Sequence, residues 1–203
     1  MTRRLAHGEA LRSEAGDDAF LSDEERGYVR GFAHARRVEE FLAGRLAARR
    51  AIAALLGTER ALRIVRERDG APRIEGLPAG VTLALSISHG ARRAIAVVAE
   101  GTAPLGVDLT DWTDAPRIRR VARRAFPRPD ERARALVDGR TACRAWAIKE
   151  AVGKALRIGL LYDGGFERIE WLGDAVRVDG VASELQLRIV DADDGPVASA
   201  IGA

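Results

Sequence analysis

The chain has 203 residues, of which 47% are apolar and 31% charged, with a formal net charge of +3, and this composition excludes a disordered chain. Cys143 is its only cysteine, which excludes an intrachain disulfide and a cysteine-based zinc site. No run of about 20 apolar residues is present and the start lacks an apolar signal segment, so we expect a cytoplasmic protein without a membrane span.

The first half of the chain predicts a helical region followed by strands. Residues 1–20 carry no periodic pattern, so we expect a loose segment there and no strand. Ser22 and Glu25 form a capping box, and apolar residues then recur at helical spacing to Gly57, with a break near His34. Strands are predicted over residues 62–65, 81–87 and 94–99, separated by turns.

The second half repeats this order of helices and strands. A strand over residues 105–109 is followed by predicted helices over 116–125, 129–137 and 141–158. Four further strands are predicted over 166–172, 175–178, 185–190 and 197–201. Helices followed by antiparallel strands, twice over, indicate an α+β fold of two lobes. We place the lobes at residues 1–103 and 104–203.

One predicted helix carries the chain's only two lysines, Lys149 and Lys154. All the remaining Lys or Arg positions of the chain are arginines. The compact ammonium of lysine at these two positions therefore points to chemistry that needs lysine. Trp146, Glu150 and Lys154 fall within about 80° of one another on this helix, so a carboxylate and an ammonium project side by side. Lys149 points about 100° away from Glu150. The alternative is an ordinary exposed Glu–Lys pair of small energetic value.

An acid follows a glycine on the first strand of the second lobe, in Gly106-Val107-Asp108. Burying an aspartate is costly unless it is paired or bound to a metal. Mg²⁺ typically takes one or two protein carboxylates together with substrate phosphates and waters. The sequence therefore indicates a cation site at Asp108, and the alternative is a solvent-facing acid on an edge strand.

Two further groups of residues are suited to anions. Ser88-His89-Gly90 ends a strand, where a hydroxyl, an imidazole and free backbone N–H groups form either an anion cradle or an ordinary polar turn. Arg117, Arg120 and Arg124 share one helical face and form a basic stripe, which suits an acidic helical partner or nucleic acid.

Taken in order, these motifs resemble those of the 4′-phosphopantetheinyl transferases, specifically the two-lobed type related to surfactin-synthetase-activating enzymes. That family has a G-[IV]-D strand followed by W-x-x-K-E-[AS]-x-x-K, here residues 106–108 and 146–154. Its upstream S-H motif matches Ser88-His89, and its G-K-P turn is approximated by residues 70–72. The resemblance covers roughly residues 21–201 and implies two similar α+β lobes in one chain, a pseudo-dimeric fold.

The resemblance implies an enzyme that moves the 4′-phosphopantetheine arm of coenzyme A (CoA) onto a serine of an apo acyl or peptidyl carrier protein. Such an enzyme releases adenosine 3′,5′-bisphosphate and serves fatty-acid, polyketide or nonribosomal peptide synthesis. The implied cofactor is Mg²⁺, with Asp108 and Glu150 as its ligands. The implied catalytic residues are Glu150, Lys154 and, as a lesser contributor, Lys149. The implied CoA-binding residues are Arg36, Arg66, Gly70, Ser88, His89 and Lys154.

The chain departs from the family pattern at two positions. Thr110 stands where many relatives have a second acid on the strand, so we expect two protein carboxylates at the metal rather than three. Ala71 replaces the lysine of the G-K-P turn. Because of these departures, an alternative is that the chain is a relative of these enzymes that binds CoA without transferring its arm.

A third reading is a basic module that binds nucleic acid without catalysis. The 5% of aromatic residues are not interleaved with the arginines, which weakens that reading. We expect a monomer that binds neither nucleic acid nor a membrane, and whose stripe Arg117 to Arg124 docks the acidic helix of the carrier protein.

Overall fold

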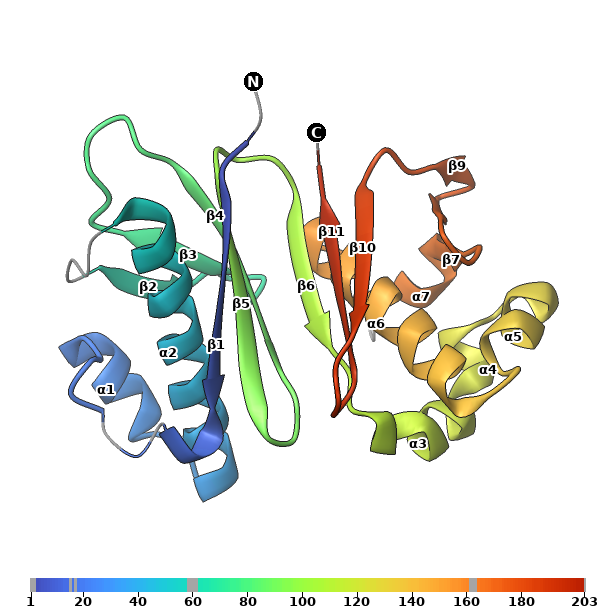
Figure 1. The fold of residues 1–203 in the computed structure, drawn as a ribbon, viewed down its shortest axis with the longest axis horizontal. Coiled ribbons are helices and arrows are strands. Elements are labelled where there is room, and N and C mark those ends of the chain that lie inside the picture. The colour runs from blue at the N-terminus through green and yellow to red at the C-terminus, as the bar shows by residue number, and fades with distance from the viewer. Residues whose placement is uncertain (1–2, 15, 17, 58–61, 161–163, 203) are drawn as a thin grey trace. The chain divides into compact units, whose positions relative to one another are not determined.

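A computed structural model describes residues 3–14, 16, 18–57, 62–160 and 164–202. The chain forms two compact units, Met1–Ala103 and Pro104–Ala203 (Figure 1). Each unit combines helices with antiparallel sheets and buries its own cluster of apolar side chains. The α+β fold class predicted from the sequence is confirmed. Within the described ranges, every helix is too short or too polar to cross a lipid bilayer.

The first unit packs a long helix on a three-stranded sheet of order β1-β5-β4, and β2 pairs with β3 in a separate hairpin. Its helices are α1 (Asp23–Val29) and α2 (Ala35–Leu56), and a short 3-10 turn, η1, covers Arg12–Glu14. Its strands are β1 (Leu5–Leu11), β2 (Arg63–Arg66), β3 (Pro72–Glu75), β4 (Leu83–His89) and β5 (Arg93–Glu100).

The prediction that the N-terminal segment is loose is wrong for Leu5–Leu11, which forms β1 along β5. Its buried positions are occupied by Gly8 and Ala10, so no bulky apolar residue marks the strand. The helix α2 lies so close that a Cβ atom on Gly8 would stand 2.1 Å from the Ala47 carbonyl oxygen and 2.5 Å from the Ala51 nitrogen. The strand is buried because its backbone lies close to the helix backbone. It therefore lacks the alternation of large apolar residues by which a strand is predicted from sequence.

The boundaries of α1 and α2 follow the signals in the sequence. Ser22 caps α1, and the side chain of Glu25 accepts a hydrogen bond from the Ser22 backbone in return, which completes the capping box. His34 precedes α2, and Gly57 ends it with a φ of 67°. That left-handed conformation suits glycine, because it lacks a Cβ atom.

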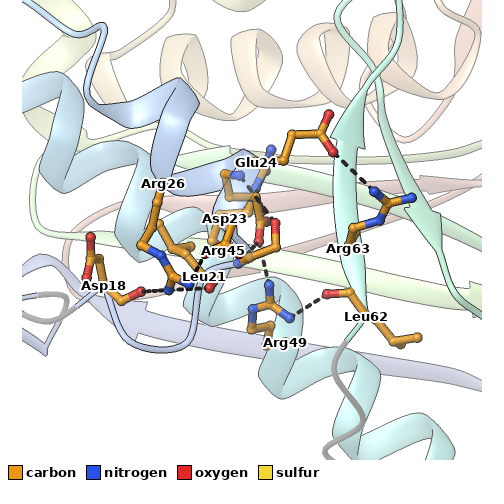
Figure 2. A network of polar contacts seen from close by, with 11 residues as sticks. Asp18, Leu21, Asp23, Glu24, Arg26, Arg45, Arg49, Leu62 and Arg63 are labelled. Atoms are coloured by element: carbon orange, nitrogen blue, oxygen red, sulfur yellow. Dashed lines mark hydrogen bonds and ion pairs between the residues drawn. The ribbon is translucent and has the colours of Figure 1, made fainter.

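A buried carboxylate joins α1 to α2. Glu25 is 4% exposed and pairs with Arg45 at 3.0 Å and with Arg49 at 2.6 Å, both on α2. Figure 2 shows this region, where Arg49 also donates to the Leu62 carbonyl oxygen at 2.7 Å. The network fixes the long helix against the short helix that precedes it and against the start of the β2–β3 hairpin.

The second unit contains a three-stranded sheet of order β10-β11-β6 and a smaller sheet of order β7-β8-β9. Its helices are α3 (Ala115–Arg120), α4 (Ala122–Ala125), α5 (Pro129–Ala135), α6 (Gly139–Ala155) and α7 (Gly165–Arg168), with a 3-10 turn, η2, at Trp112–Asp114. Its strands are β6 (Leu105–Leu109), β7 (Ile169–Trp171), β8 (Val176–Val178), β9 (Val181–Ala182), β10 (Gln186–Asp191) and β11 (Pro196–Ile201).

The two units share one plan. In each main sheet the last strand lies in the middle, flanked by the first and the penultimate strands, and one long helix packs on it. Gly106 on β6 repeats the role of Gly8, because a Cβ atom there would stand 1.8 Å from the Ala151 carbonyl oxygen of α6. A glycine on the first strand therefore sets the distance between helix and sheet in both units.

Three predicted elements of the second unit differ in detail. The helix expected over residues 116–125 is two helices that are separated at Val121, whose φ of −99° and ψ of 12° depart from helical values. The strand expected from Phe166 begins as α7, because Gly164 adopts a φ of 68° and starts a helical turn. The helix expected to reach Ile158 ends at Ala155, since Arg157 takes a positive φ of 56°.

Candidate active site

Asp108 stands on β6 and faces α6, on the same side of the strand as Gly106 and Thr110. Its side chain accepts two hydrogen bonds in a buried setting: Oδ1 from the Lys154 ammonium at 2.7 Å and Oδ2 from the Thr110 hydroxyl at 2.8 Å. Lys154 also donates to the Val107 carbonyl oxygen at 3.0 Å. The strand acid and the helix lysine predicted from the sequence are therefore in direct contact.

Glu150 brings a second carboxylate to Asp108, one helical turn before Lys154. Burial first, and then the negative charge of Asp108, raise the pKa of Glu150 from its ordinary value of 4.5 to about 7. The positive charges of Lys154 and Arg117 act in the opposite direction. Two carboxylates close to each other repel when both are ionised, and a bound cation relieves this repulsion.

Arg117 belongs to this neighbourhood, which the sequence did not show. Its guanidinium lies 5.4 Å from the centre of the Trp146 ring, and its Nε pairs with the Asp114 carboxylate at 3.1 Å. The spacing of the arginines predicted a partner-binding role for Arg117, which stays a prediction. In the structure its charge also lies close enough to Glu150 to lower the pKa of that group. The spacing of residues within α6 gives no information about a charged side chain that belongs to another helix.

Lys149 does not join the group around Asp108, and its expected contribution to catalysis stays a prediction. Its side chain is fully buried, and its ammonium donates to Glu131 at 2.8 Å and to the Phe166 carbonyl oxygen at 3.0 Å. Burial lowers the pKa of Lys149, although the hydrogen bond to Glu131 works against that change. The angle of about 100° between neighbouring helical residues separates Lys149 from Glu150.

The donors around Asp108 fit Mg²⁺. Asp108 and Glu150 supply carboxylate oxygens and Thr110 a hydroxyl, and hard oxygen donors are what Mg²⁺ prefers. Among the described residues, no three His, Cys, Asp or Glu side chains gather closely enough to hold a metal ion by themselves. Such a pair leaves coordination positions for water and substrate phosphates, which is how Mg²⁺ is usually bound.

A second group of charged residues lies in the first unit, around Glu40 of α2. Its carboxylate pairs with Arg36 at 3.0 Å and with Arg12 at 2.9 Å, and Arg37 lies 3.5 Å away. Burial acts to raise the pKa of Glu40, but the hydrogen bond from Arg36 and the charges of Arg12, Arg36 and His89 together lower it. Three arginines around one carboxylate leave an excess of positive charge next to His89.

The end of β4 separates Ser88 from His89. The His89 ring packs on α2 at Gly44, where a Cβ atom would stand 2.3 Å from its Nε2 atom. Ser88 is buried and, because side chains alternate along a strand, it faces away from α2. Of these two predicted CoA-binding residues, only His89 joins Arg36 at Glu40.

The β2–β3 hairpin brings together the two remaining predicted CoA-binding residues. Arg66 packs on Gly70, where a Cβ atom would stand 3.1 Å from an Arg66 Nη atom. Its other Nη atom donates to the Tyr28 hydroxyl at 3.1 Å. Tyr28 in turn packs against Phe41, the neighbour of Glu40 in sequence, with ring centres 5.5 Å apart. No sequence pattern pointed to Tyr28, because it comes from a different helix.

Two family models match the chain. The model of the 4′-phosphopantetheinyl transferase N-terminal domain matches residues 24–99, and the model of the 4′-phosphopantetheinyl transferase superfamily matches residues 104–190. The chain belongs to the 4′-phosphopantetheinyl transferase superfamily. The N-terminal match contains the Glu40 group and the β2–β3 hairpin, and the second match contains Asp108, Glu150 and Lys154.

Solved structures of two proteins are similar to about half of this chain. A holo-(acyl-carrier-protein) synthase from Bacillus anthracis str. Ames, in complex with CoA (3′,5′-ADP), shares 24% identity with a TM-score of 0.44, over 48% of this chain and 96% of its own. A holo-[acyl-carrier-protein] synthase from Neisseria meningitidis shares 19% identity with a TM-score of 0.42, over 48% of this chain and 97% of its own. The comparison with curated proteins finds no match.

The raised pKa of Glu150 predicts how the stability of this chain depends on pH. Between about pH 4.5 and 7 the folded chain binds more protons at Glu150 than the unfolded chain does, so this group's contribution to the free energy of unfolding falls as pH rises. The loss amounts to about 3 kcal/mol at most and levels off above pH 7. Urea denaturation without divalent cations, at pH 5 to 8, measures it.

The Glu150→Gln variant is the control for this measurement, because glutamine does not titrate. We expect its free energy of unfolding to lack the decline that the parent shows between pH 5 and 7. Equal declines in both proteins would contradict the raised pKa.

Proposed function

We propose that this chain transfers the 4′-phosphopantetheine arm of CoA to a serine hydroxyl of an apo acyl or peptidyl carrier protein, with Mg²⁺, and releases adenosine 3′,5′-bisphosphate. The observation that carries this proposal is the convergence of a strand acid, Asp108, and a helix acid, Glu150, beside the Lys154 ammonium. The reacting pyrophosphate of CoA is multiply charged, so its transfer depends on a cation and on positioned positive side chains.

The second unit supplies the chemistry in this proposal. Asp108 and Glu150 would hold Mg²⁺, and the ion would supply neutralisation of the pyrophosphate charge and polarisation at phosphorus. The serine oxygen forms a bond to phosphorus, and the bond from phosphorus to the oxygen of the nucleotide breaks. Glu150 accepts the serine proton, either directly or through a water molecule. Lys154 stabilises the negative charge on the departing nucleotide.

The first unit supplies the binding of the nucleotide end of CoA. Arg36 and His89 offer positive charge to a phosphate, since the three arginines around Glu40 exceed its single negative charge. Arg66 on Gly70 offers a second cation on the β2–β3 hairpin. Ser88 adds a polar group at the end of β4, although it faces away from His89.

The proposal is tested by incubating the protein with CoA, Mg²⁺ and several apo-carrier proteins and measuring the intact mass of each carrier. We expect one carrier at least to gain one phosphopantetheine arm, with release of adenosine 3′,5′-bisphosphate. Folded protein that binds CoA by calorimetry yet modifies none of the carriers would overturn the proposal in favour of a relative that binds CoA without transfer.

The arginines of α3 and α4 are proposed to dock the acidic helix of the carrier protein. Arg120 and Arg123 are exposed, and neither is part of the group around Asp108. Charge reversal in the double variant R120E/R123E is expected to raise KM for the carrier about tenfold or more, because like charges oppose docking. The KM for CoA is expected to stay unchanged.

The matched control for this double variant is Arg188→Glu, on the exposed strand β10 of the same unit. It changes the net charge in the same direction without altering α3 or α4. Because each Arg→Glu substitution changes the net charge equally, an Arg188→Glu effect on log KM for the carrier half as large as that of the double variant would show that overall charge, rather than this surface, attracts the carrier.

A further inference from the structure

A buried ion pair involves the residue that precedes the candidate active-site acid in the sequence. Lys149 and Glu131 are both fully buried and 2.8 Å apart. The same Glu131 oxygen accepts a hydrogen bond from the Trp171 backbone N–H at 2.8 Å, and Lys149 also donates to the Phe166 carbonyl oxygen at 3.0 Å. The rings of Phe126 and Phe166 flank the ammonium with their centres 5.4 and 5.7 Å away. This pair therefore joins α6 to α5, α7 and β7.

Lys149 precedes Glu150 in the helix, so the direction of one side chain determines the direction of the other. When the Lys149 ammonium is held at a buried point, α6 cannot rotate about its axis without breaking that contact. Glu150 then projects about 100° around the helix from Lys149, which is the direction of Asp108. A contact made only of apolar side chains would be less directional than an ion pair with two backbone hydrogen bonds.

The first unit carries the counterpart of this pair. Arg45 lies two residues before Ala47, which faces Gly8, and Lys149 lies two residues before Ala151, which faces Gly106. Arg45 pairs with the buried Glu25, the third residue of α1, as Lys149 pairs with Glu131, the third residue of α5. A cation on the long helix and a buried acid on the preceding short helix are thus used twice.

The two pairs differ in the residue that comes directly after the cation. Leu46 comes after Arg45 in the first unit, whereas Glu150 comes after Lys149 in the second. The same contact therefore holds an apolar residue in one unit and the candidate active-site acid in the other. This difference makes the first unit a natural control for the second.

We propose that the buried Lys149–Glu131 pair is a positioning device that fixes the rotation of α6 and so directs Glu150 towards Asp108. This inference rests on the proposed transferase function. Lys149 acts through Glu150 and does not itself touch the substrate, which explains why a motif lysine is sealed inside the second unit.

The test compares Lys149→Met with the double variant K149M/E131L, both assayed below the melting temperature of each protein. Removal of one partner leaves a buried unpaired carboxylate and is expected to lower the melting temperature by about 10 °C. Replacement of both partners by apolar residues of similar volume is expected to recover most of that loss. We expect kcat for transfer to stay at least about tenfold below the parent in both variants, with KM for CoA within about threefold.

The control is R45M/E25L, also assayed below its melting temperature, which removes the counterpart pair in the first unit together with the contacts of Glu25 with Arg49 and the Ser22 backbone. It is expected to leave kcat near the parent value, because α6 is untouched. A K149M/E131L protein with parent stability and parent kcat would overturn the positioning role and leave a purely structural pair. A raised KM with unchanged kcat would also overturn it. A parent chain that transfers no arm would instead overturn the proposed function, and this role with it.

Discussion

The variants Asp108→Asn and Glu150→Gln are each expected to lower kcat for phosphopantetheine transfer about 100- to 1000-fold while the chain stays folded. Each substitution keeps the size of the side chain but removes one of the two carboxylate charges that attract a divalent cation. Asp108→Asn also weakens the partner of the Lys154 ammonium, which lies 2.7 Å from Oδ1. The measurement is the rate at which a carrier protein gains mass, at saturating CoA and Mg²⁺.

Two further variants make this result specific. Thr110→Val removes the hydroxyl that donates to Asp108 Oδ2 at 2.8 Å but no charge, so its loss is expected to be only about tenfold. Glu184→Gln removes an exposed carboxylate of the same unit and is expected to change nothing. Near-parent rates in Asp108→Asn and Glu150→Gln would remove the basis for placing a cation between these two acids.

Substitution of Gly106 by alanine is expected to cost about 3 kcal/mol or more of folding free energy and to abolish most of the transfer activity. The added Cβ atom would stand 1.8 Å from the Ala151 carbonyl oxygen and 2.7 Å from the Ala155 nitrogen. Both contacts are with helix backbone, which cannot turn aside as a flexible side chain does. The helix must move away from β6, and Glu150 moves with it, away from Asp108.

Gly27→Ala is the matched control for Gly106→Ala, because a Cβ atom on Gly27 in α1 meets no heavy atom within 4 Å. Alanine favours a helix over glycine by about 1 kcal/mol, so this variant should be as stable as the parent or more so. Urea denaturation and the transfer rate measure both proteins. A stable and active Gly106→Ala protein would contradict the close packing of α6 on β6.

Local signals in the sequence were sufficient for the helices of the first unit. The capping box of Ser22 and Glu25 and the left-handed Gly57 mark boundaries through chemistry that involves only neighbouring residues. The strand Leu5–Leu11 escaped prediction because its buried residues are small, and their smallness reflects a helix that lies dozens of residues away in the sequence. A periodic pattern of large apolar residues reveals a buried strand, whereas a strand buried through small residues that contact a helix backbone has no such pattern.

The same distinction applies to the active site. Asp108, Glu150 and Lys154 could be predicted because their order and spacing resemble a known motif, and the structure brings them together. The helical angle correctly separated Lys149 from Glu150, but nothing local revealed that the Lys149 ammonium pairs with a buried Glu131. The closeness of Arg117 to Glu150 was missed for a similar reason, since the two residues come from different helices.

The transfer proposed for this chain depends on one divalent cation that Asp108 and Glu150 hold against the pyrophosphate of CoA. A crystal structure of the protein soaked with CoA and Mn²⁺ tests it most directly, because the anomalous signal of manganese locates the ion independently of the ligand. We predict a single anomalous peak bound by both carboxylates and by phosphate oxygens of CoA. A peak elsewhere, or CoA bound with no ion between Asp108 and Glu150, would contradict it.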